Sequence, residues 1–138
     1  MHDQSFRELL NNVCKRPAMF VGRSDFDLAA TFLHGYDWAL RNLSPDVRNS
    51  GLSGFREWLA VRLDSCVRSD WSEIIRREDT GPDKFEALAR LYEEFWQDRK
   101  EWGLEAILAD FERLQSVVTR GLRNRTCWCE KPIEERNR

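Results

Sequence analysis

Apolar residues recur with the period of an α-helix over most of this chain. Between residues 5 and 14 they fall three and four positions apart, which places them on one face of a helix. No run of alternating apolar and polar residues is long enough to predict a β-strand. The pattern therefore predicts an all-α fold, a compact single-domain bundle of five to six helices. Further helices are expected at about 24–43, 54–67, 71–77, 83–100 and from about 102 or 103 to 118.

The segment 15–22 interrupts the helical pattern. Pro17 fixes its own φ and disfavours the α conformation for Arg16, so the first helix is expected to end here. Three large apolar residues follow directly, too few for a helix and costly to leave in water. We therefore expect a short, extended and buried connector between the first two helices. These three residues are Met19, Phe20 and Val21.

The length of 138 residues is typical of one domain. We expect the helical domain to span residues 1–122 and residues 123–138 to form a charged C-terminal tail, loosely docked or frayed, since little in it is apolar. No apolar run approaches the roughly 20 residues of a transmembrane helix, and no signal-peptide pattern opens the chain. A cytoplasmic protein without membrane association is the expectation.

The net charge of −2 conceals an uneven distribution. Residues 70–112 carry thirteen acidic and six basic side chains, whereas residues 113–138 carry three acidic and seven basic ones. This argues against a nucleic-acid-binding protein with one positive face and favours an acidic surface that meets a basic partner. An ordinary solvated helix face is the alternative. The acidic surface would comprise Glu78, Asp79, Glu93, Glu94, Asp98 and Glu101.

The residues typical of metal and catalytic sites are sparse. Cys127 and Cys129 flank Trp128, but a structural zinc site needs four ligands and no complete set is visible, so neither a metal nor a cofactor is expected. His34 and Asp37 are spaced to pair on one helix, as in base catalysis. No nucleophile or second acid stands beside them, so a surface or half-buried helix histidine is the favoured interpretation.

Two sequence resemblances are present. Residues 15–22 are similar to a Lys-Arg-Pro-Gly-Met-Tyr-Ile-Gly segment of the type II topoisomerase ATPase domain, but the following helix lacks that family's Glu and Asn, and we infer no ATPase. Four motifs occur in order along the chain: Arg16–Gly22, Gly35-Tyr36, Phe55–Arg62, and Trp71 with Ile74-Ile75. Together they resemble the pattern of small bacterial all-helical proteins, some of them similar to immunity proteins of toxin systems. The resemblance implies structural roles for Arg16, Pro17, Met19, Phe20, Gly22, Tyr36, Trp58, Arg62 and Trp71.

The sequence as a whole favours a non-enzymatic protein-binding protein. The most concrete hypothesis is an immunity protein that neutralises a cognate bacterial toxin by occluding its active site. The alternatives are a structural or homo-oligomeric helical protein, or a small acid/base enzyme using His34 and Asp37.

Tryptophan and arginine side chains give expectations that a structure can test. Trp58, Trp71, Trp96 and Trp102 lie near inward helix faces, and Trp38 and Trp128 are the expected exposed anchors. Trp102 would anchor a partner of the acidic surface if it were exposed. Arg62 falls between inward leucines, so we expect its guanidinium to be partly buried and paired.

Overall fold

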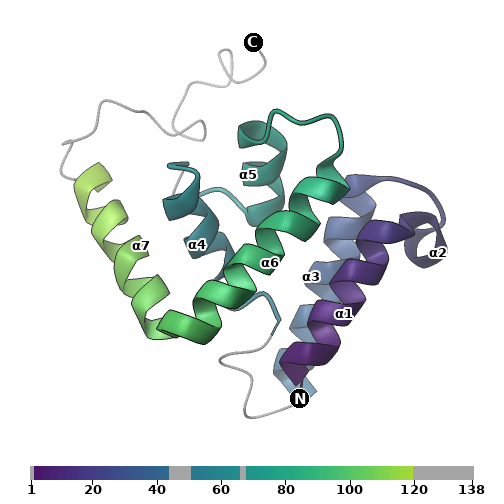
Figure 1. Ribbon diagram of the computed structural model, residues 1–138, viewed down its shortest axis with the longest axis horizontal. Coiled ribbons are helices and arrows are strands. Elements are labelled where there is room, and N and C mark those ends of the chain that lie inside the picture. The colour runs from purple at the N-terminus through teal and green to yellow at the C-terminus, as the bar shows by residue number, and fades with distance from the viewer. Residues whose placement is uncertain (1, 44–50, 66–67, 120–138) are drawn as a thin grey trace. The chain divides into compact units, whose positions relative to one another are not determined.

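A computed structural model describes residues 2–43, 51–65 and 68–119. Seven helices and no β-strand occur in these ranges, which confirms the all-α class (Figure 1). The helices are α1 (His2–Lys15), α2 (Pro17–Val21), α3 (Phe26–Leu43), α4 (Phe55–Arg62), α5 (Trp71–Glu78), α6 (Lys84–Trp102) and α7 (Leu104–Thr119). The expected C-terminal tail and its cysteines lie outside the described residues.

The contacts of the chain fall into two compact units. Unit 1 comprises Met1–Ser53 and Asp79–Glu94, and unit 2 comprises Gly54–Glu78 and Phe95–Arg138. Helix α6 therefore contributes its first part to unit 1 and its last two turns to unit 2.

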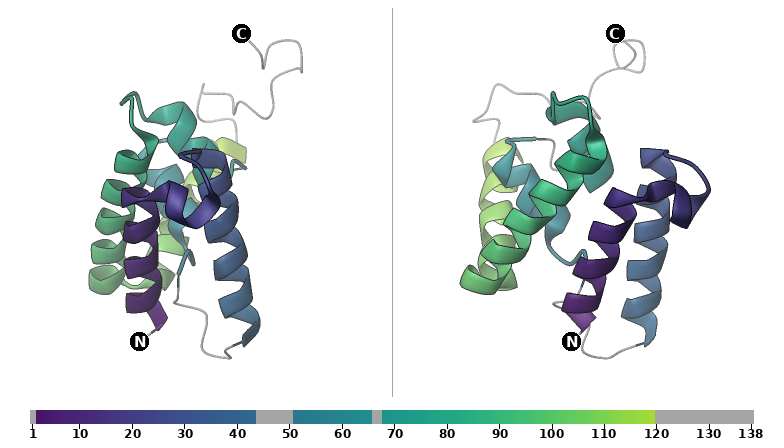
Figure 2. Two further views of the ribbon diagram at one scale, coloured as in Figure 1. Left: turned by 90° about the vertical axis from the view of Figure 1, so that its right-hand side faces the viewer. Right: turned by 45° about the vertical axis from the view of Figure 1, so that its right-hand side comes forward.

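The core of unit 1 lies between α1, α3 and the first part of α6. Helices α1 and α3 run side by side, as both views of Figure 2 show. The Phe6 ring of α1 lies 5.9 Å from that of Tyr92 in α6, and the Tyr92 hydroxyl donates a hydrogen bond of 2.9 Å to the Gly51 carbonyl. The fully buried side chains of this unit include Phe6, Leu10, Val13, Leu33, Leu88 and Tyr92.

Helix α2 corrects the expected connector, which is neither extended nor buried. Pro17 occupies the first turn of α2, where its fixed φ suits a helix and its missing N–H costs nothing. Gly22 ends the helix in a left-handed conformation. No residue of α2 is buried, and Met19 is 73% exposed. The Phe20 ring recovers part of the exposure cost by packing 6.0 Å from Phe32 of α3.

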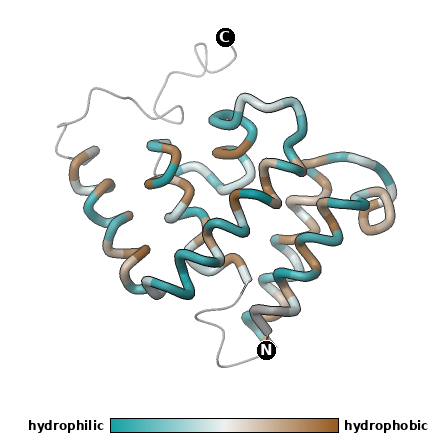
Figure 3. Tube along the Cα trace, viewed as in Figure 1, coloured by the Kyte–Doolittle hydropathy of each residue, from teal (hydrophilic) through white to brown (hydrophobic). Residues whose placement is uncertain are grey.

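Unit 2 is built on a cluster of aromatic rings. The Phe55 ring of α4 lies 5.2 Å from Phe95 of α6 and 5.7 Å from Trp71 of α5. Trp58, Trp71 and Trp96 are buried, as the sequence predicted. Helix α7 carries hydrophobic positions at intervals, separated by hydrophilic ones, so that it has one apolar side (Figure 3). Helix α4 packs against both α5 and α7.

A glycine allows α4 and α7 to approach closely. Gly54 precedes α4 with a φ of +86°, and a Cβ atom built on it would lie 2.5 Å from the Cδ1 atom of Leu104. Side chains with a Cβ rarely adopt this φ, and none would fit without displacing Leu104. The start of α7 is therefore held against the start of α4.

Candidate functional site

A pocket of about 500 Å³ opens on unit 2, at the three helices α4, α6 and α7. Its volume lies within the roughly 300–1,000 Å³ that is usual for ligand sites. We call it the α4–α6–α7 pocket. It is lined by Trp58, Val61, Arg62, Asp98, Trp102, Ala106, Ile107, Asp110 and Arg113.

Helical spacing explains why these residues share one pocket. Asp98 and Trp102 lie one turn apart in the last part of α6, and the lining residues of α7 recur at intervals of one, three and three positions. Gly103, at a φ of +86°, joins the two helices. Because α6 ends directly before it, the lining faces of both helices meet the lining face of α4.

The lining side chains differ sharply in exposure. Trp58 and Ile107 are buried, at 7% and 6% exposure, and form the base of the pocket. Trp102 is 66% exposed and stands at its edge. The expectation that Trp102 lies near an inward face is therefore wrong, because this residue is the last of α6 and has no further turn to pack beside. Its use as an exposed anchor remains open.

Asp98 is held in place by the base of the pocket. Its Oδ2 atom accepts a hydrogen bond of 2.8 Å from the indole Nε1–H of Trp58, and the side chain is half-buried. Within the described ranges Asp98 forms no ion pair. A partly desolvated carboxylate is thus satisfied by one neutral donor, which compensates a negative charge less well than a cation does.

The remaining charged residues of the pocket lie at its exposed edge. Arg113 forms an ion pair with Asp110, and their side chains are 75% and 57% exposed, so the pair is screened by water. Arg62 is also exposed, which corrects the expectation of a partly buried guanidinium. It is the last residue of α4, where the pocket opens to solvent, so the inward stripe does not continue through it.

The expected acidic surface is not brought together within either unit. Unit 1 contains Asp79, Glu93 and Glu94, and unit 2 contains Glu78, Asp98 and Glu101. Glu78 accepts a hydrogen bond from the Ser65 hydroxyl and pairs with Arg77 at 3.3 Å.

Three residues of the expected acidic surface lie in the later part of α6: Glu94, Asp98 and Glu101. Only Glu101 is exposed, whereas Glu94 and Asp98 are half-buried.

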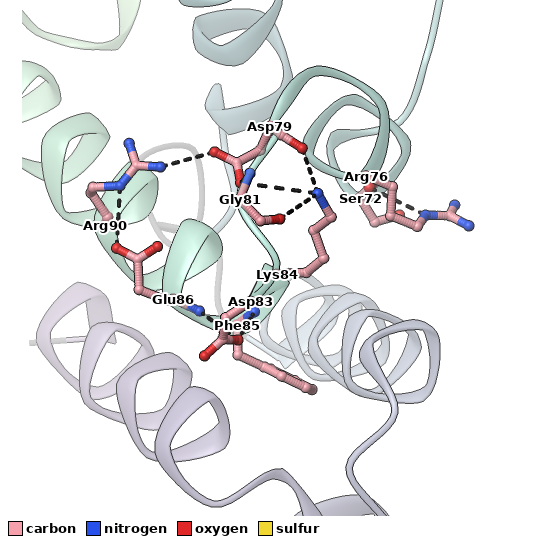
Figure 4. Close-up of polar contacts among 9 residues, drawn as sticks. All are labelled: Ser72, Arg76, Asp79, Gly81, Asp83, Lys84, Phe85, Glu86 and Arg90. Carbon is pink, nitrogen blue, oxygen red and sulfur yellow. Dashed lines mark hydrogen bonds and ion pairs between the residues drawn. The ribbon is translucent and has the colours of Figure 1, made fainter.

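Asp79 organises the loop before α6 (Figure 4). Its carboxylate pairs with Arg90 at 3.0 Å and accepts a hydrogen bond of 3.1 Å from the Gly81 N–H. Lys84 donates to the carbonyls of Asp79 and Gly81, and Arg90 also pairs with Glu86 at 3.3 Å. These contacts close the loop on itself, so Asp79 has a structural role.

Glu93 has a local partner as well. It accepts two hydrogen bonds from the Arg7 guanidinium, which links α6 to α1 inside unit 1. The hydrogen bond to Glu93 raises the pKa of Arg7. The carboxylates of Glu78, Asp79 and Glu93 are therefore neutralised by cations of their own unit, and little of their charge is available to a partner.

The expected acid/base pair is His34 and Asp37, and the carboxylate of Asp37 is bonded to groups that hold the fold. Asp37 is buried, its Oδ1 accepts the Leu52 N–H at 2.9 Å, and its Oδ2 pairs with Arg41 at 2.9 Å. His34 is half-buried on the same helix. Because both oxygens of Asp37 hold the fold, this carboxylate is poorly placed to orient an imidazole for catalysis.

Two further findings concern the described ranges only. No group of three or more His, Cys, Asp or Glu side chains there is arranged to hold a metal ion. None of their helices combines the length and the apolar character needed to cross a membrane. Cys127, Trp128 and Cys129 lie outside these ranges.

The fold and the pocket define an all-α protein with an open, aromatic-edged cavity of mixed charge. The chain matches no protein-family model, no curated protein and no solved structure in the comparisons. Sequence reasoning had singled out Trp58, Arg62, Asp98 and Trp102 individually. It missed Val61, Ala106, Ile107, Asp110 and Arg113, although the helix-breaking Gly103 between two amphipathic patterns was a signal that two helices turn back there.

Proposed function

We propose that this protein is a non-enzymatic protein-binding protein and that its binding surface is the α4–α6–α7 pocket. The observation that carries the proposal is the exposure of Trp102 at the edge of a partly apolar cavity. Tryptophan is enriched at the energetic centres of protein interfaces, where it contributes a large rigid area. Exposure of the Trp102 indole to water does not help unit 2 to fold.

The surroundings of Trp102 support a protein partner. Interfaces combine an apolar centre with a polar, hydrated edge. Here buried Trp58 and Ile107 supply the centre, and the exposed Asp110–Arg113 pair supplies part of the edge. We propose further that the partner is a bacterial toxin whose active site is occluded by this surface, as the sequence resemblance implies.

A toxin encoded beside the gene for this chain is the partner to test. The experiment measures the dissociation constant for the wild type, Trp102→Ala and Trp38→Ala. Trp38 is the matched control, since it is 68% exposed and belongs to unit 1. We expect Trp102→Ala to weaken binding at least about 30-fold, the roughly 2 kcal/mol of an interface hot spot, and Trp38→Ala to change it less than about threefold.

Cell growth provides the second readout. The wild type and Trp38→Ala should protect cells that express the toxin, whereas Trp102→Ala should protect them poorly. Equal binding and equal protection by both variants would remove the pocket from the proposal. Absence of any complex would remove the toxin.

A homo-oligomer is the second candidate, and one observation favours it. Unit 1 exposes a set of large apolar side chains that no described contact covers fully: Met19, Phe20, Leu28, Tyr36, Trp38 and Leu43. Analytical ultracentrifugation of the wild type and Trp38→Ala tests it. A dimer that dissociates on this substitution would favour self-association through unit 1, and a monomer in both would exclude it.

A further inference from the structure

We propose that the α4–α6–α7 pocket binds a basic side chain, a lysine or arginine of the protein partner. The charged group of that side chain would form an ion pair with the Asp98 carboxylate. The inference deepens the proposed function and rests on it. It specifies that the partner residue in the pocket is basic, which the presence of a pocket alone does not.

The first support is the state of the Asp98 carboxylate. It is half-buried, it lines the pocket, and Trp58 fixes its position through one neutral hydrogen bond. A cation that reached it would form a charge-assisted hydrogen bond in partly desolvated surroundings, where Coulomb attraction exceeds its value in bulk water. No described residue forms an ion pair with Asp98, so the partner would supply the counter-charge.

The second support is the aromatic lining. Trp58 and Trp102 both line the pocket that contains Asp98. Indole faces attract cations through the ring quadrupole, and tryptophan does so best among the aromatic residues. Two tryptophans and a carboxylate together are the chemistry that recognises an ammonium or guanidinium group.

The third support is the apolar remainder of the lining. Val61, Ala106 and Ile107 present only hydrocarbon to the cavity. Lysine and arginine side chains carry three or four methylene groups that gain free energy from such walls while their charged end reaches a polar site. The pocket thus suits a long amphipathic side chain better than a compact cation.

The two arginines of the lining do not cancel this preference. Arg113 is paired with Asp110, so these two residues add no net charge, and both are largely exposed. Arg62 is exposed at the end of α4. Water screens exposed charges more than half-buried ones, so Asp98 dominates the field inside the pocket.

The test is a titration of the full chain with two small probes, followed by NMR of the indole Nε1–H resonances. The probes are Nα-acetyl-lysine methylamide and its neutral analogue Nα-acetyl-norleucine methylamide, which has the same hydrocarbon stem without the charge. We expect a saturable shift of the Trp58 resonance with the lysine probe at about millimolar concentration, and binding of the norleucine probe at least about tenfold weaker.

Two variants locate the source of the preference. Asp98→Asn keeps an oxygen that accepts from Trp58 but removes the charge. The preference for the lysine probe should therefore fall at least about fivefold, to what the indole faces alone provide. Glu101→Gln removes an exposed charge one turn further along α6 and should keep the preference.

Three outcomes would overturn the inference: equal binding of the two probes to the wild type, a preference that is undiminished in Asp98→Asn, or no saturable shift with the lysine probe. Each leaves the proposed function to its own test. A Trp102→Ala variant that loses the partner while the probes bind equally would keep the protein-binding function and refute the basic anchor. A lysine preference without any effect of Trp102→Ala on the partner would place the partner elsewhere.

Discussion

Replacing Gly54 by alanine tests whether the close approach of α4 and α7 holds the pocket together. The added methyl group would have two consequences. First, residue 54 has a backbone φ of +86°, in the left-handed region that side chains with a Cβ atom rarely adopt. Second, the added Cβ atom would lie 2.5 Å from Leu104 Cδ1 and 3.8 Å from Ile107 Cγ2. The contact with Ile107, which lines the pocket, is an ordinary van der Waals distance, so the clash falls on Leu104 at the start of α7.

The loss in the free energy of unfolding is the sum of these two effects. A left-handed conformation costs a residue with a Cβ about 1–2 kcal/mol. A carbon–carbon distance of 2.5 Å lies far inside the optimum of about 3.5–4.0 Å, so Leu104 must move, and overpacking of this kind costs about 1–3 kcal/mol. The free energy of unfolding should therefore fall by about 2–5 kcal/mol, a large share of the roughly 5–15 kcal/mol available to a domain.

Gly103 provides a matched control in the same unit. Its φ is also +86°, but a Cβ atom built there would meet nothing within 4 Å. Gly103→Ala should thus lose only the conformational term of about 1–2 kcal/mol. Urea denaturation of both variants, monitored by tryptophan fluorescence, gives the two free energies. Equal losses would refute the argument, because they would show that Leu104 yields without cost.

Three further predictions concern unit 1: two of its buried hydrogen bonds and the half-buried thiol of Cys14. Asp37→Ala should lower the free energy of unfolding by about 1–3 kcal/mol, because the buried Leu52 N–H loses its acceptor; urea denaturation measures it, and an unchanged midpoint would contradict it. Tyr92→Phe should cost about 1 kcal/mol in the same assay, since only the hydrogen bond to the Gly51 carbonyl is lost; a loss below about 0.3 kcal/mol would show that the bond contributes little. Burial, with a smaller contribution from the charge of Asp83, raises the pKa of Cys14 to about 12, so iodoacetamide should alkylate it at pH 8 about 1,000-fold more slowly in the native than in the unfolded chain. Because the pKa is raised, the rate should increase about tenfold per pH unit up to the denaturation limit, as peptide mass spectrometry can follow, and a pH-independent rate would exclude a thiolate mechanism.

The sequence predicted the helices well because their apolar positions follow one clear period. The prediction of an extended, buried connector was wrong for a local reason. Three consecutive apolar residues indicated burial, yet Pro17 at the first turn and Gly22 at the end specify a one-turn helix, and helix formation there does not depend on burial. Met19 shows that a hydrophobic side chain is not by itself evidence for a core position.

The site was predictable only in part, because it depends on contacts between distant residues. Sequence showed acidic residues on α6, but not which of them a cation of the same unit would neutralise. Glu93 pairs with Arg7 of α1, and Asp98 accepts a hydrogen bond from the indole of Trp58, which lies forty positions away in the sequence. Spacing along one helix predicts a shared face, whereas pairing across helices depends on their packing, which a single sequence does not specify.

Asp98→Asn separates the two roles that its position permits. If Asp98 serves only as the acceptor for Trp58, the asparagine oxygen replaces it, and the partner should bind as before. If its charge holds a basic anchor, affinity for the partner should fall about 10- to 100-fold, the range of one charge-assisted bond, with slower binding at low salt.

Stability should respond little in either case. A hydrogen bond to a charged group is worth about 1 kcal/mol more than a neutral one, so the thermal midpoint should fall by only about 4 °C. Calorimetry and binding measured on the same preparation therefore distinguish the roles. A large loss of stability with unchanged affinity would make Asp98 a structural residue, and it would move the search for the anchoring charge to Glu101, the exposed carboxylate one turn further along the helix.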